Sequence, residues 1–408
     1  MLFLYNLGIR LYWLLIQLAC LKSAKARFFV EGRRRLFDRI ERAVLPGKKH
    51  IWFHFASLGE FEQGRPVLEE MRKTYPESRI FVTFFSPSGY EIRKNYLLAD
   101  HIFYLPIDTR HNARRFIDLV NPEIAIFTKY EYWYHYFTEL KKRDVPLYVI
   151  SGIFRKDQPF FKWYGGLHRK MLKCVSYFFV QNQESQRLLA ELKHENIIVS
   201  GDTRFDRVYE NAQNPKKIDL VESFCGGNKV IVAGSTWLPD EKLLTALPAL
   251  FPGWKLIIAP HEIGDNRIKE IETLFPESVR FTRMKVSATS YQTLIVDNIG
   301  MLSSLYQYGD VAFIGGGFGA GIHNTLEAAA FGLPVIFGPQ YEKFQEAKDL
   351  IKLGAAFPVN DAEELKLVSE KLITEVYRLR AGDNARTYVE ANTGATAMIV
   401  EHIKLPDN

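Results

Sequence analysis

The chain has 408 residues, of which 47% are hydrophobic and 25% are charged. This composition excludes a disordered or fibrous protein, and the length allows two domains that each bury a core. Its three cysteines, at positions 20, 174 and 225, lie too far apart for a disulfide framework, and no Cys and His cluster has zinc spacing, so we expect no structural metal.

The positive charge is concentrated at the N-terminus. The net charge is +6, but residues 1–50 hold 11 Lys and Arg against 3 Asp and Glu, which is +8, and the rest of the chain is near −2. Because the charge is confined to one segment, we expect this segment, and not the whole surface, to bind a charged partner. No nucleic-acid recognition motif accompanies it. We therefore expect an anionic membrane surface as the partner, and no nucleic acid.

Residues 1–25 are predicted to form a membrane anchor helix. Residues 1–21 are apolar apart from Asn6, Arg10 and Gln17, whose spacings of 4 and 7 put them on one helical stripe. A helix in the membrane interface with this stripe outward accommodates Arg10 better than a spanning helix, where a central Arg costs roughly 2.5–3.5 kcal/mol. A helix packed on the protein itself is the alternative. The basic residues that follow suit anionic headgroups and a cytoplasmic body.

From residue 50 onward, predicted strands and helices alternate. Strands are expected at 50–55, 79–85, 101–106, 123–128, 146–150, 176–180 and 197–200, with helices at 60–73, 111–120 and 132–143. A second series of strands follows at 229–233, 255–258, 293–296, 311–314 and 334–337. Such alternation predicts α/β domains with parallel sheets covered by helices on both faces.

Four segments follow from this pattern. Residues 202–227 are polar, rich in Gly, Asn and Pro, and without a sustained apolar period, which predicts a domain linker. The tail at 362–403 is predicted to be helical. We expect an anchor at 1–25, a first domain at 26–208, a second at 209–380, and a helix at 381–408 that returns toward the first. Two doubly wound domains that face each other place their ligand sites along a central cleft, at the carboxyl ends of the strands.

Two acidic residues follow strands of the first domain. Glu60 opens the helix after strand 50–55, and Glu131 follows strand 123–128 within an aromatic cluster. Two carboxylates at one cleft allow one to act as a general base while the other positions the hydroxyl. A first-turn acid that complements the helix dipole is the alternative role of Glu60.

The strand ends of the second domain are polar or glycine-rich. Ser235 and Thr236 suit a phosphate, although a helix N-cap is equally compatible with the pattern. Pro260 and His261 end the next strand, and residues 297–302 end another. These ends are expected to converge on the glycine-rich stretch at 315–321.

The stretch at 311–339 is the most distinctive part of the sequence. A buried strand runs into glycines at 315, 316, 317, 319 and 321, and a helix is predicted to begin at Asn324, with Glu327 three residues later. A strand, a bare loop and a helix N-terminus make an anion site. A tight turn closed by a capping box between Asn324 and Glu327 is the alternative. The spacing is neither the dinucleotide fingerprint nor the P-loop.

Several of these motifs together resemble those of the 3-deoxy-D-manno-octulosonic acid (Kdo) transferase family. They are the blocks at 56–60 (ASLGE), 201–206 (GDTRFD), 234–236 (GST), 297–300 (DNIG) and 323–330 (HNTLEAAA). The resemblance implies a GT-B fold at the cytoplasmic face of the inner membrane. It also implies an inverting transfer of Kdo from CMP-Kdo to the 6′-hydroxyl of a lipid A precursor, in lipopolysaccharide biosynthesis.

The resemblance also assigns site residues. Glu60 would be the general base, Glu131 would assist at the transition state, and Arg204 would hold the charge of the departing CMP. CMP would be bound by the residues at the ends of the second domain's strands: Ser235, Thr236, Pro260, His261, Gly300, Met301, Leu302, Gly317, Asn324, Thr325, Leu326 and Glu327. Neither a metal nor another cofactor is implied, because arginine and helix N–H groups can neutralise a monophosphate leaving group.

The chain departs from the family pattern at three places: Gly300-Met301-Leu302, Pro260-His261 and residues 151–155. The last leaves the acceptor contacts open. Two basic residues, Arg155 and Lys156, and four aromatic ones (Phe160, Phe161, Trp163 and Tyr164) could meet a phosphorylated, acylated sugar or simply pack on the core. The alternative functions are a UDP-sugar 2-epimerase and a non-catalytic nucleotide-binding membrane tether.

Overall fold

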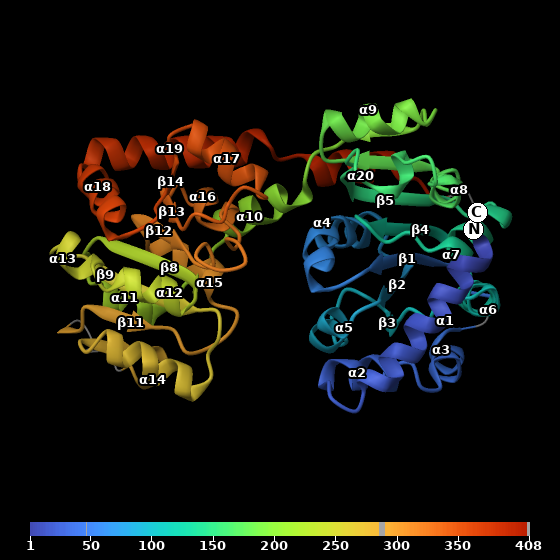
Figure 1. Cartoon of the computed structure of the whole chain (residues 1–408), viewed down its shortest axis with the longest axis horizontal. Coiled ribbons are helices and arrows are strands. Elements are labelled where there is room, and N and C mark those ends of the chain that lie inside the picture. Colours follow the sequence, from blue (N-terminus) through green and yellow to red (C-terminus); the bar gives the residue numbers. More distant parts are fainter. Residues whose placement is uncertain (46, 285–289, 406–408) are drawn as a thin grey trace. The chain divides into compact units, whose positions relative to one another are not determined.

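Two parallel sheets of seven strands organise the computed structural model, which describes residues 1–45, 47–284 and 290–405 (Figure 1). Each sheet belongs to its own unit. Unit 1 is Met1–Asp206 with Thr393–Asn408, and unit 2 is Arg207–Asn392.

Unit 1 contains the sheet with strand order β3-β2-β1-β4-β5-β6-β7. Its strands are β1 His50–Phe55, β2 Arg79–Phe84, β3 His101–Tyr104, β4 Pro122–Thr128, β5 Leu147–Gly152, β6 Tyr177–Val180 and β7 Ile197–Val199. Its helices are α1 Leu2–Ala19, α2 Ala24–Glu31, α3 Leu36–Ala43, α4 Leu58–Thr74, α5 Pro87–Arg93, α6 Arg110–Val120, α7 Tyr134–Lys142, α8 Gly166–Leu172, α9 Gln183–Glu191 and α20 Ala395–His402. The chain order reverses between β1 and β4, which defines a doubly wound sheet and its switch point.

Unit 2 repeats this plan with strand order β10-β11-β9-β8-β12-β13-β14. Its strands are β8 Val230–Thr236, β9 Lys255–Pro260, β10 Ser278–Arg280, β11 Thr293–Ile295, β12 Val311–Ile314, β13 Val335–Phe337 and β14 Ala356–Pro358. Its helices are α11 Asp219–Cys225, α12 Leu238–Leu244, α13 Leu247–Leu250, α14 Asp265–Leu274, α15 Leu302–Leu305, α16 Leu326–Ala330, α17 Gln345–Lys352, α18 Ala362–Ile373 and α19 Glu375–Ala391. The predicted fold class, two doubly wound units of GT-B type, is confirmed.

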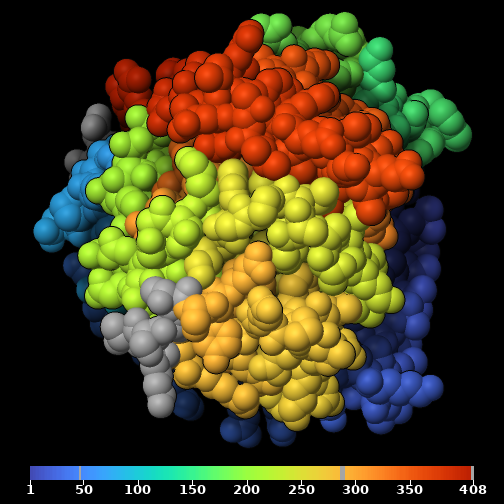
Figure 2. Space-filling view, turned by 90° about the vertical axis from the view of Figure 1, so that its left-hand side faces the viewer, coloured from blue at the N-terminus to red at the C-terminus, as the bar shows by residue number. Residues whose placement is uncertain are grey.

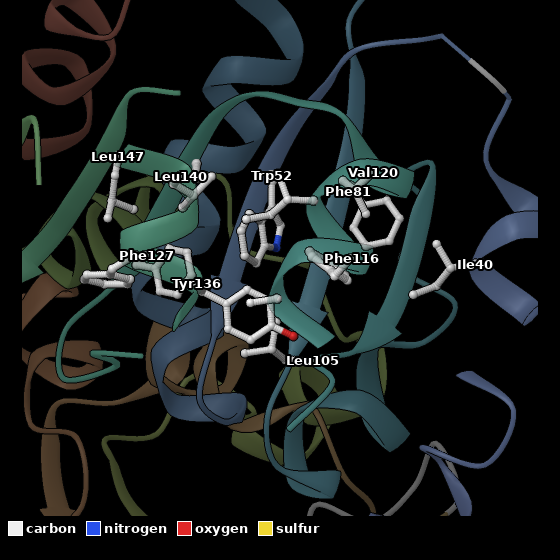
Figure 3. Close-up of a cluster of buried hydrophobic side chains, with 14 of the residues drawn as sticks. Ile40, Trp52, Phe81, Leu105, Phe116, Val120, Phe127, Tyr136, Leu140 and Leu147 are labelled. Atoms are coloured by element: carbon white, nitrogen blue, oxygen red, sulfur yellow. The ribbon is translucent and has the colours of Figure 1, made fainter. Parts of the chain in front are cut away.

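Strand β1 illustrates why the sheets are parallel and covered on both faces. All six of its residues are buried, as expected for a central strand between two helical layers. Ile51, Phe53 and Phe55 enter the core on one face, and Trp52 enters the core on the other. The indole of Trp52 packs against Phe116 and Phe127, with ring centroids 4.9 and 5.1 Å away (Figure 3).

The predicted linker at 202–227 contains the boundary between the two units, but it is helical along much of its length. It holds α10, Thr203–Gln213, and α11, and the two units divide inside α10, after Asp206. Phe205 and Val208 of α10 are buried three residues apart, too short an apolar pattern to mark a helix in a polar sequence.

The C-terminal tail crosses between the units later than residue 381. Helix α19 stays in unit 2, and the chain joins unit 1 from Thr393 onward. Asp206 holds this junction, because its carboxylate accepts from the Gly394 N–H at 2.6 Å and from the Thr396 N–H and hydroxyl at 2.7 Å each. Helix α20 then buries Ile399 in the core of unit 1. Within unit 2, α18 lies side by side with α13 (Figure 2).

Helix α1 packs on unit 1 along one side. The Tyr5 hydroxyl donates to Asp108 Oδ2 at 2.5 Å, and His135 Nε2–H donates to Asn6 Oδ1 at 2.7 Å. The prediction that the polar stripe faces outward is therefore wrong for Asn6, whose bond to the body fixes this side of the helix inward. The opposite side exposes leucines, at positions 4, 7, 11, 14, 15 and 18. Among the described residues, α1 is the one helix long and apolar enough to cross a bilayer by length and composition.

Candidate active site

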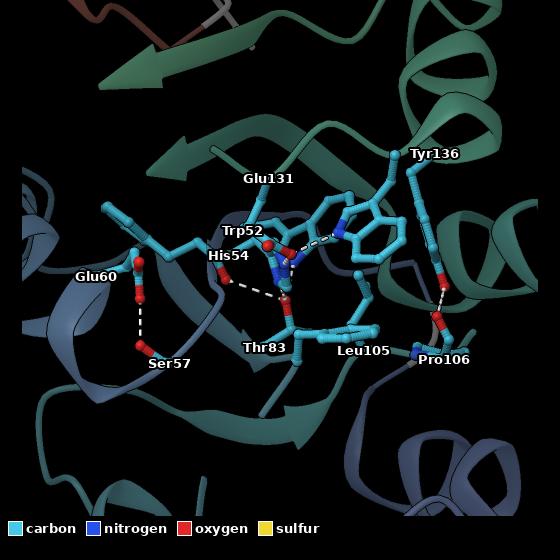
Figure 4. Close-up of polar contacts among 12 residues, drawn as sticks. Trp52, His54, Ser57, Glu60, Thr83, Leu105, Pro106, Glu131 and Tyr136 are labelled. Atoms are coloured by element: carbon cyan, nitrogen blue, oxygen red, sulfur yellow. Dashed lines mark hydrogen bonds and ion pairs between the residues drawn. The ribbon is translucent and has the colours of Figure 1, made fainter. Parts of the chain in front are cut away.

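Glu60 lies in the first turn of α4, directly after β1. Ser57 caps this helix by accepting from the Gly59 N–H at 3.3 Å, and its hydroxyl also donates to Glu60 Oε2 (Figure 4). The carboxylate is half-buried and lies in the first turn of a 17-residue helix. Glu60 is thus an oriented carboxylate at the carboxyl edge of the sheet.

Glu131 follows β4, the neighbour of β1 at the switch point. Its Oε2 atom accepts from the Trp133 indole N–H at 2.7 Å and lies 3.2 Å from His54 Nε2 (Figure 4). Because an ionised carboxylate only accepts, the Nε2–H of His54 donates to it. His54 Nδ1 lies 2.8 Å from the Thr83 hydroxyl oxygen, which accepts from the Trp52 indole N–H at 2.8 Å. This buried chain of hydrogen bonds fixes the Glu131 side chain, which is 15% exposed.

Arg204 lies at the start of α10 and is held by its neighbour Asp202. Its Nε and one Nη atom both donate to Asp202 Oδ2 at 2.8 Å. Asp202 also accepts from the Gln63 amide at 3.5 Å, and the Thr203 hydroxyl donates to the Gln63 carbonyl. Gln63 lies one turn after Glu60 on α4, so Arg204 is tied to the same helix as Glu60. The structure therefore brings the three predicted catalytic residues to one edge of unit 1.

The candidate acceptor residues in the loop after β5 fall into two sets, one buried and one exposed. Phe160 is buried in a core cluster with Phe154, whereas Trp163 is 92% exposed and Tyr164 is exposed beside it. The guanidinium of Arg155 lies 5.7 Å from the Tyr130 ring, next to Glu131. Core packing therefore explains the buried residues of this loop, whereas the exposed ones lie on the surface.

In unit 2 the four polar strand ends are adjacent, as the sequence predicted. Strands β11, β9, β8 and β12 are consecutive in the sheet, so residues 297–302, Pro260 with His261, Ser235 with Thr236, and the glycine stretch leave the same edge side by side. Gly300 has φ +88°, which favours glycine there, and Leu302 packs against Gly234 of β8.

The glycine loop itself differs from the prediction of a bare anion cradle. Its N–H groups are used within the unit: those of Gly319 and Gly321 donate to the Gly316 carbonyl, and that of Gly316 donates to Asp240 Oδ2 at 2.9 Å. The glycines serve close packing, because a Cβ on Gly315 would lie 2.3 Å from the Ser235 carbonyl oxygen. Backbone contact, rather than room for a ligand, explains much of the glycine content.

The helix after this loop starts later and is shorter than predicted. Helix α16 begins at Leu326 and has five residues, so its dipole is small. Asn324 Oδ1 accepts from the Leu326 N–H at 3.1 Å, and the Asn324 amide donates to Glu327 Oε1 at 3.1 Å. The predicted capping box is therefore wrong, because Glu327 is bound by the side chain of Asn324 and not by its backbone. Thr325 is buried with no hydrogen-bond partner for its hydroxyl in the described part of the chain.

Three rings stack at the ends of β8, β9 and β12. The His261 ring lies 4.6 Å from the Trp237 ring and 4.6 Å from the His323 ring, at interplanar angles of 25° and 23°. The Trp237 indole donates to His323 Nε2 at 3.1 Å, which requires that nitrogen to be unprotonated. Burial and the neighbouring His261 lower the pKa of His323, in agreement with this bond. The sequence singled out His261 but missed Trp237, since no motif predicts a ring stack.

Two buried acids behind this stack were also missed. The Thr236 hydroxyl donates to Glu241 Oε1 at 2.9 Å, so in this structure it points into the unit and not toward a ligand. Asp240 accepts from the Trp237 N–H at 2.8 Å as well as from Gly316. These acids hold the strand ends in register with the glycine loop. The described residues contain no cluster of three His, Cys, Asp or Glu side chains that could hold a metal ion.

We expect the stability of unit 2 to depend on pH through Asp240. Burial raises the pKa of this carboxyl, so the native state holds a proton that the unfolded chain has lost. The free energy of unfolding therefore falls as the pH rises above about 4, the pKa of an unfolded aspartate. The Asp240→Asn side chain cannot ionise, so the free energy of unfolding of this variant should not fall in this way. The urea midpoint of the wild type should fall relative to that of the variant from pH 4 upward, and a constant difference would contradict this role.

Gly317 gives a second stability prediction. A Cβ at this position would lie 2.6 Å from the Gly338 nitrogen and 2.7 Å from its Cα. Gly317→Ala should therefore destabilise unit 2 by about 1–3 kcal/mol, the usual cost of overpacking, measured by urea denaturation. Gly319→Ala is the matched control, because its nearest contact would be 3.6 Å, and it should change stability by less than about 0.5 kcal/mol. Equal losses in both variants would contradict the packing role.

Comparison with known proteins shows which family the chain resembles. Residues 30–207 match the family model described as 3-deoxy-D-manno-octulosonic-acid transferase (kdotransferase). The chain is 27% identical over 395 residues to the 3-deoxy-D-manno-octulosonic acid transferase of Haemophilus influenzae, with 91% of each chain covered. It is 28% identical over 355 residues to that of Aquifex aeolicus, covering 83% of this chain and 90% of the relative. The chain is therefore similar to Kdo transferases along most of its length.

Structural comparison supports the fold. The UDP-GlcNAc 2-epimerase from Neisseria meningitidis bound to UDP-GlcNAc has a TM-score of 0.62 at 15% identity, covering 86% of this chain and 98% of that one. At this identity the likeness is one of fold alone, so it does not favour the epimerase alternative. The similarity to Kdo transferases supports a glycosyltransferase.

Proposed function

We propose that this enzyme transfers Kdo from CMP-Kdo to the 6′-hydroxyl of a lipid A precursor, with inversion at the anomeric carbon. The observation that carries the proposal is the contrast between the two carboxylates at the switch point of unit 1. Glu131 is fixed by Trp133 and His54, whereas among the described residues Glu60 is bound by Ser57 alone. Glu60 is therefore the carboxylate that can accept a proton, while Glu131 is held in place.

In this mechanism Glu60 removes the proton of the acceptor hydroxyl. The hydroxyl oxygen attacks the anomeric carbon of Kdo, and the bond from that carbon to the CMP phosphate oxygen breaks, so CMP leaves with the electron pair. Attack from the face opposite the leaving group inverts the configuration. Arg204 stabilises the negative charge on the departing phosphate, and Asp202 orients its guanidinium through the bonds at 2.8 Å.

Unit 2 is the donor-binding unit in this proposal. CMP lies on the adjacent strand ends, where His261 and residues Gly300 to Leu302 contact the nucleotide and Asn324 to Glu327 bind the ribose and phosphate. The adjacency of β11, β9, β8 and β12 supports this assignment, because ligands of doubly wound sheets bind at the carboxyl ends of strands beside the switch point.

Attachment to the cytoplasmic face of the inner membrane is part of the proposal. Helix α1 exposes a leucine stripe, and residues 22–42 add eight Lys and Arg close to it. Apolar side chains that enter the interface, together with basic residues at the headgroups, are a sufficient anchor for a peripheral enzyme. The acceptor lipid lies in the same membrane.

Incubation with CMP-Kdo and a tetra-acylated lipid A precursor, followed by mass measurement of the lipid, tests the function. We expect the lipid to gain the mass of one or more Kdo residues and CMP to be released. An epimerised nucleotide sugar formed without a lipid acceptor would replace the proposal with the epimerase alternative. Binding of CMP without any transfer would favour the other alternative, a non-catalytic nucleotide-binding membrane tether.

A further inference from the structure

Two neighbouring cavities in the N-terminal segment are lined by none of the residues assigned above to catalysis or to CMP binding. The first has a volume of about 680 Å³ and lies between α1, the α2–α3 segment and the residues that follow β3. Its walls include Ile9 and Trp13 of α1, Val30, Phe37 and Ile107. This volume is within the roughly 300–1,000 Å³ of ligand pockets, and most of the lining is apolar.

The second cavity is polar and has a volume of about 440 Å³. Four arginines line it, at positions 34, 35, 39 and 42, against the two acids Glu31 and Asp38. The buried Nε of Arg39 has no hydrogen-bond partner among the described residues. The excess of guanidinium groups over carboxylates favours an anionic ligand.

The two cavities meet. Glu31 and Arg34 line both of them, so an apolar chamber opens beside an arginine-lined one. The same helix that contributes Ile9 and Trp13 to the apolar chamber exposes its leucine stripe on the other side. An occupant that matches this arrangement has an apolar chain and a phosphate close to each other.

We infer that the paired cavities bind one acidic phospholipid of the bilayer, with an acyl chain between α1 and Phe37 and its phosphate on the arginines at 34, 35, 39 and 42, in and directly before α3. The position of the arginines favours a bilayer lipid over the sugar acceptor. Helix α3 packs on β3, the edge strand, and β2 lies between β3 and the strand that precedes Glu60. A lipid whose phosphate lies on α3 therefore keeps its headgroup away from the catalytic carboxylates. The bound lipid would hold α1 and the leucine stripe at the membrane surface.

The test uses the full chain extracted from phosphatidylglycerol-containing vesicles into mild detergent. Native mass spectrometry should find one phosphatidylglycerol retained per chain. Two variants should lose it: Val30→Trp, which fills the apolar chamber without changing charge, and the triple variant Arg34→Gln, Arg39→Gln, Arg42→Gln. The triple variant should also bind phosphatidylglycerol vesicles on the order of 100-fold more weakly, since each basic residue contributes about 1 kcal/mol at an anionic surface.

The matched control is Lys141→Gln, Lys142→Gln, Lys170→Gln, which removes the same charge from α7 and α8 and should keep the lipid. Unfolding temperatures of all variants exclude misfolding as the cause of a loss. Retention of the lipid by both cavity variants, or equal loss in the control, would overturn the inference. Mole-for-mole displacement of phosphatidylglycerol by the lipid A precursor would also overturn it, because the site would then belong to the acceptor. Transfer to a detergent-dispersed acceptor reports on the proposed function separately.

Discussion

Replacing Glu60 with glutamine is expected to lower kcat for Kdo transfer by about 10³-fold, within the range that general base catalysis contributes. Glutamine keeps the size of the side chain, and its carbonyl oxygen can still accept from the Ser57 hydroxyl. It has no basic site for the proton of the acceptor hydroxyl. The loss should therefore fall on the chemical step and not on folding.

The affinity for CMP separates this role from a structural one. Because Glu60 belongs to unit 1 and the proposed CMP site belongs to unit 2, Glu60→Gln should bind CMP as tightly as the wild type in calorimetry. Ser57→Ala is the companion variant. It removes the N-cap and the bond to Glu60 but leaves the base, so it should cost no more than about tenfold in kcat and about 1 kcal/mol in stability. Transfer by Glu60→Gln at more than a tenth of the wild-type rate would exclude Glu60 as the base.

Most strands could be predicted from the sequence. A strand that is buried on both faces is apolar along most of its length, and such a run is easy to recognise. The run 311–314 is apolar throughout, and 50–55 is apolar apart from its two histidines. Strands β10 and β14 were missed, because each is three residues long and neither is an apolar run: β10 contains Ser278 and Arg280, and β14 ends at Pro358. Helix α10 was missed because its exposed face is polar and its buried face is short.

The candidate site was predictable in its strand ends but not in its contacts. Glu60, Glu131 and the 315–327 region stand out because they directly follow apolar runs. His54 lies inside such a run, so nothing in the sequence separates it from a core residue, and its bond to Glu131 spans 77 positions. The glycines at 315 and 317 were recognised as backbone positions without side chains. Their actual neighbours, the backbones of Ser235 and Gly338, come from other strands and could not be inferred from local sequence.

The second large effect on kcat is expected from substitutions of Glu131 and of His54, which is hydrogen-bonded to it. Glu131→Gln should lower kcat about 10²-fold, because a neutral amide cannot stabilise positive charge that develops at the reacting centre. His54→Phe keeps the buried ring but removes the donor at 3.2 Å, and should lower kcat about tenfold by letting the carboxylate move.

A double-mutant cycle distinguishes positioning from an independent role. His54 contacts Glu131 and Thr83 but lies behind the carboxylate, fully buried, so we expect it to act only through Glu131. The double variant should then be no slower than Glu131→Gln alone, within about threefold in kcat. Trp133→Phe, which removes the other donor to the same oxygen, should behave in the same way. Additive losses of about 10³-fold in the double variant would show that His54 serves the reaction by another route, and a lowered unfolding temperature with unchanged kcat would reduce it to a packing residue.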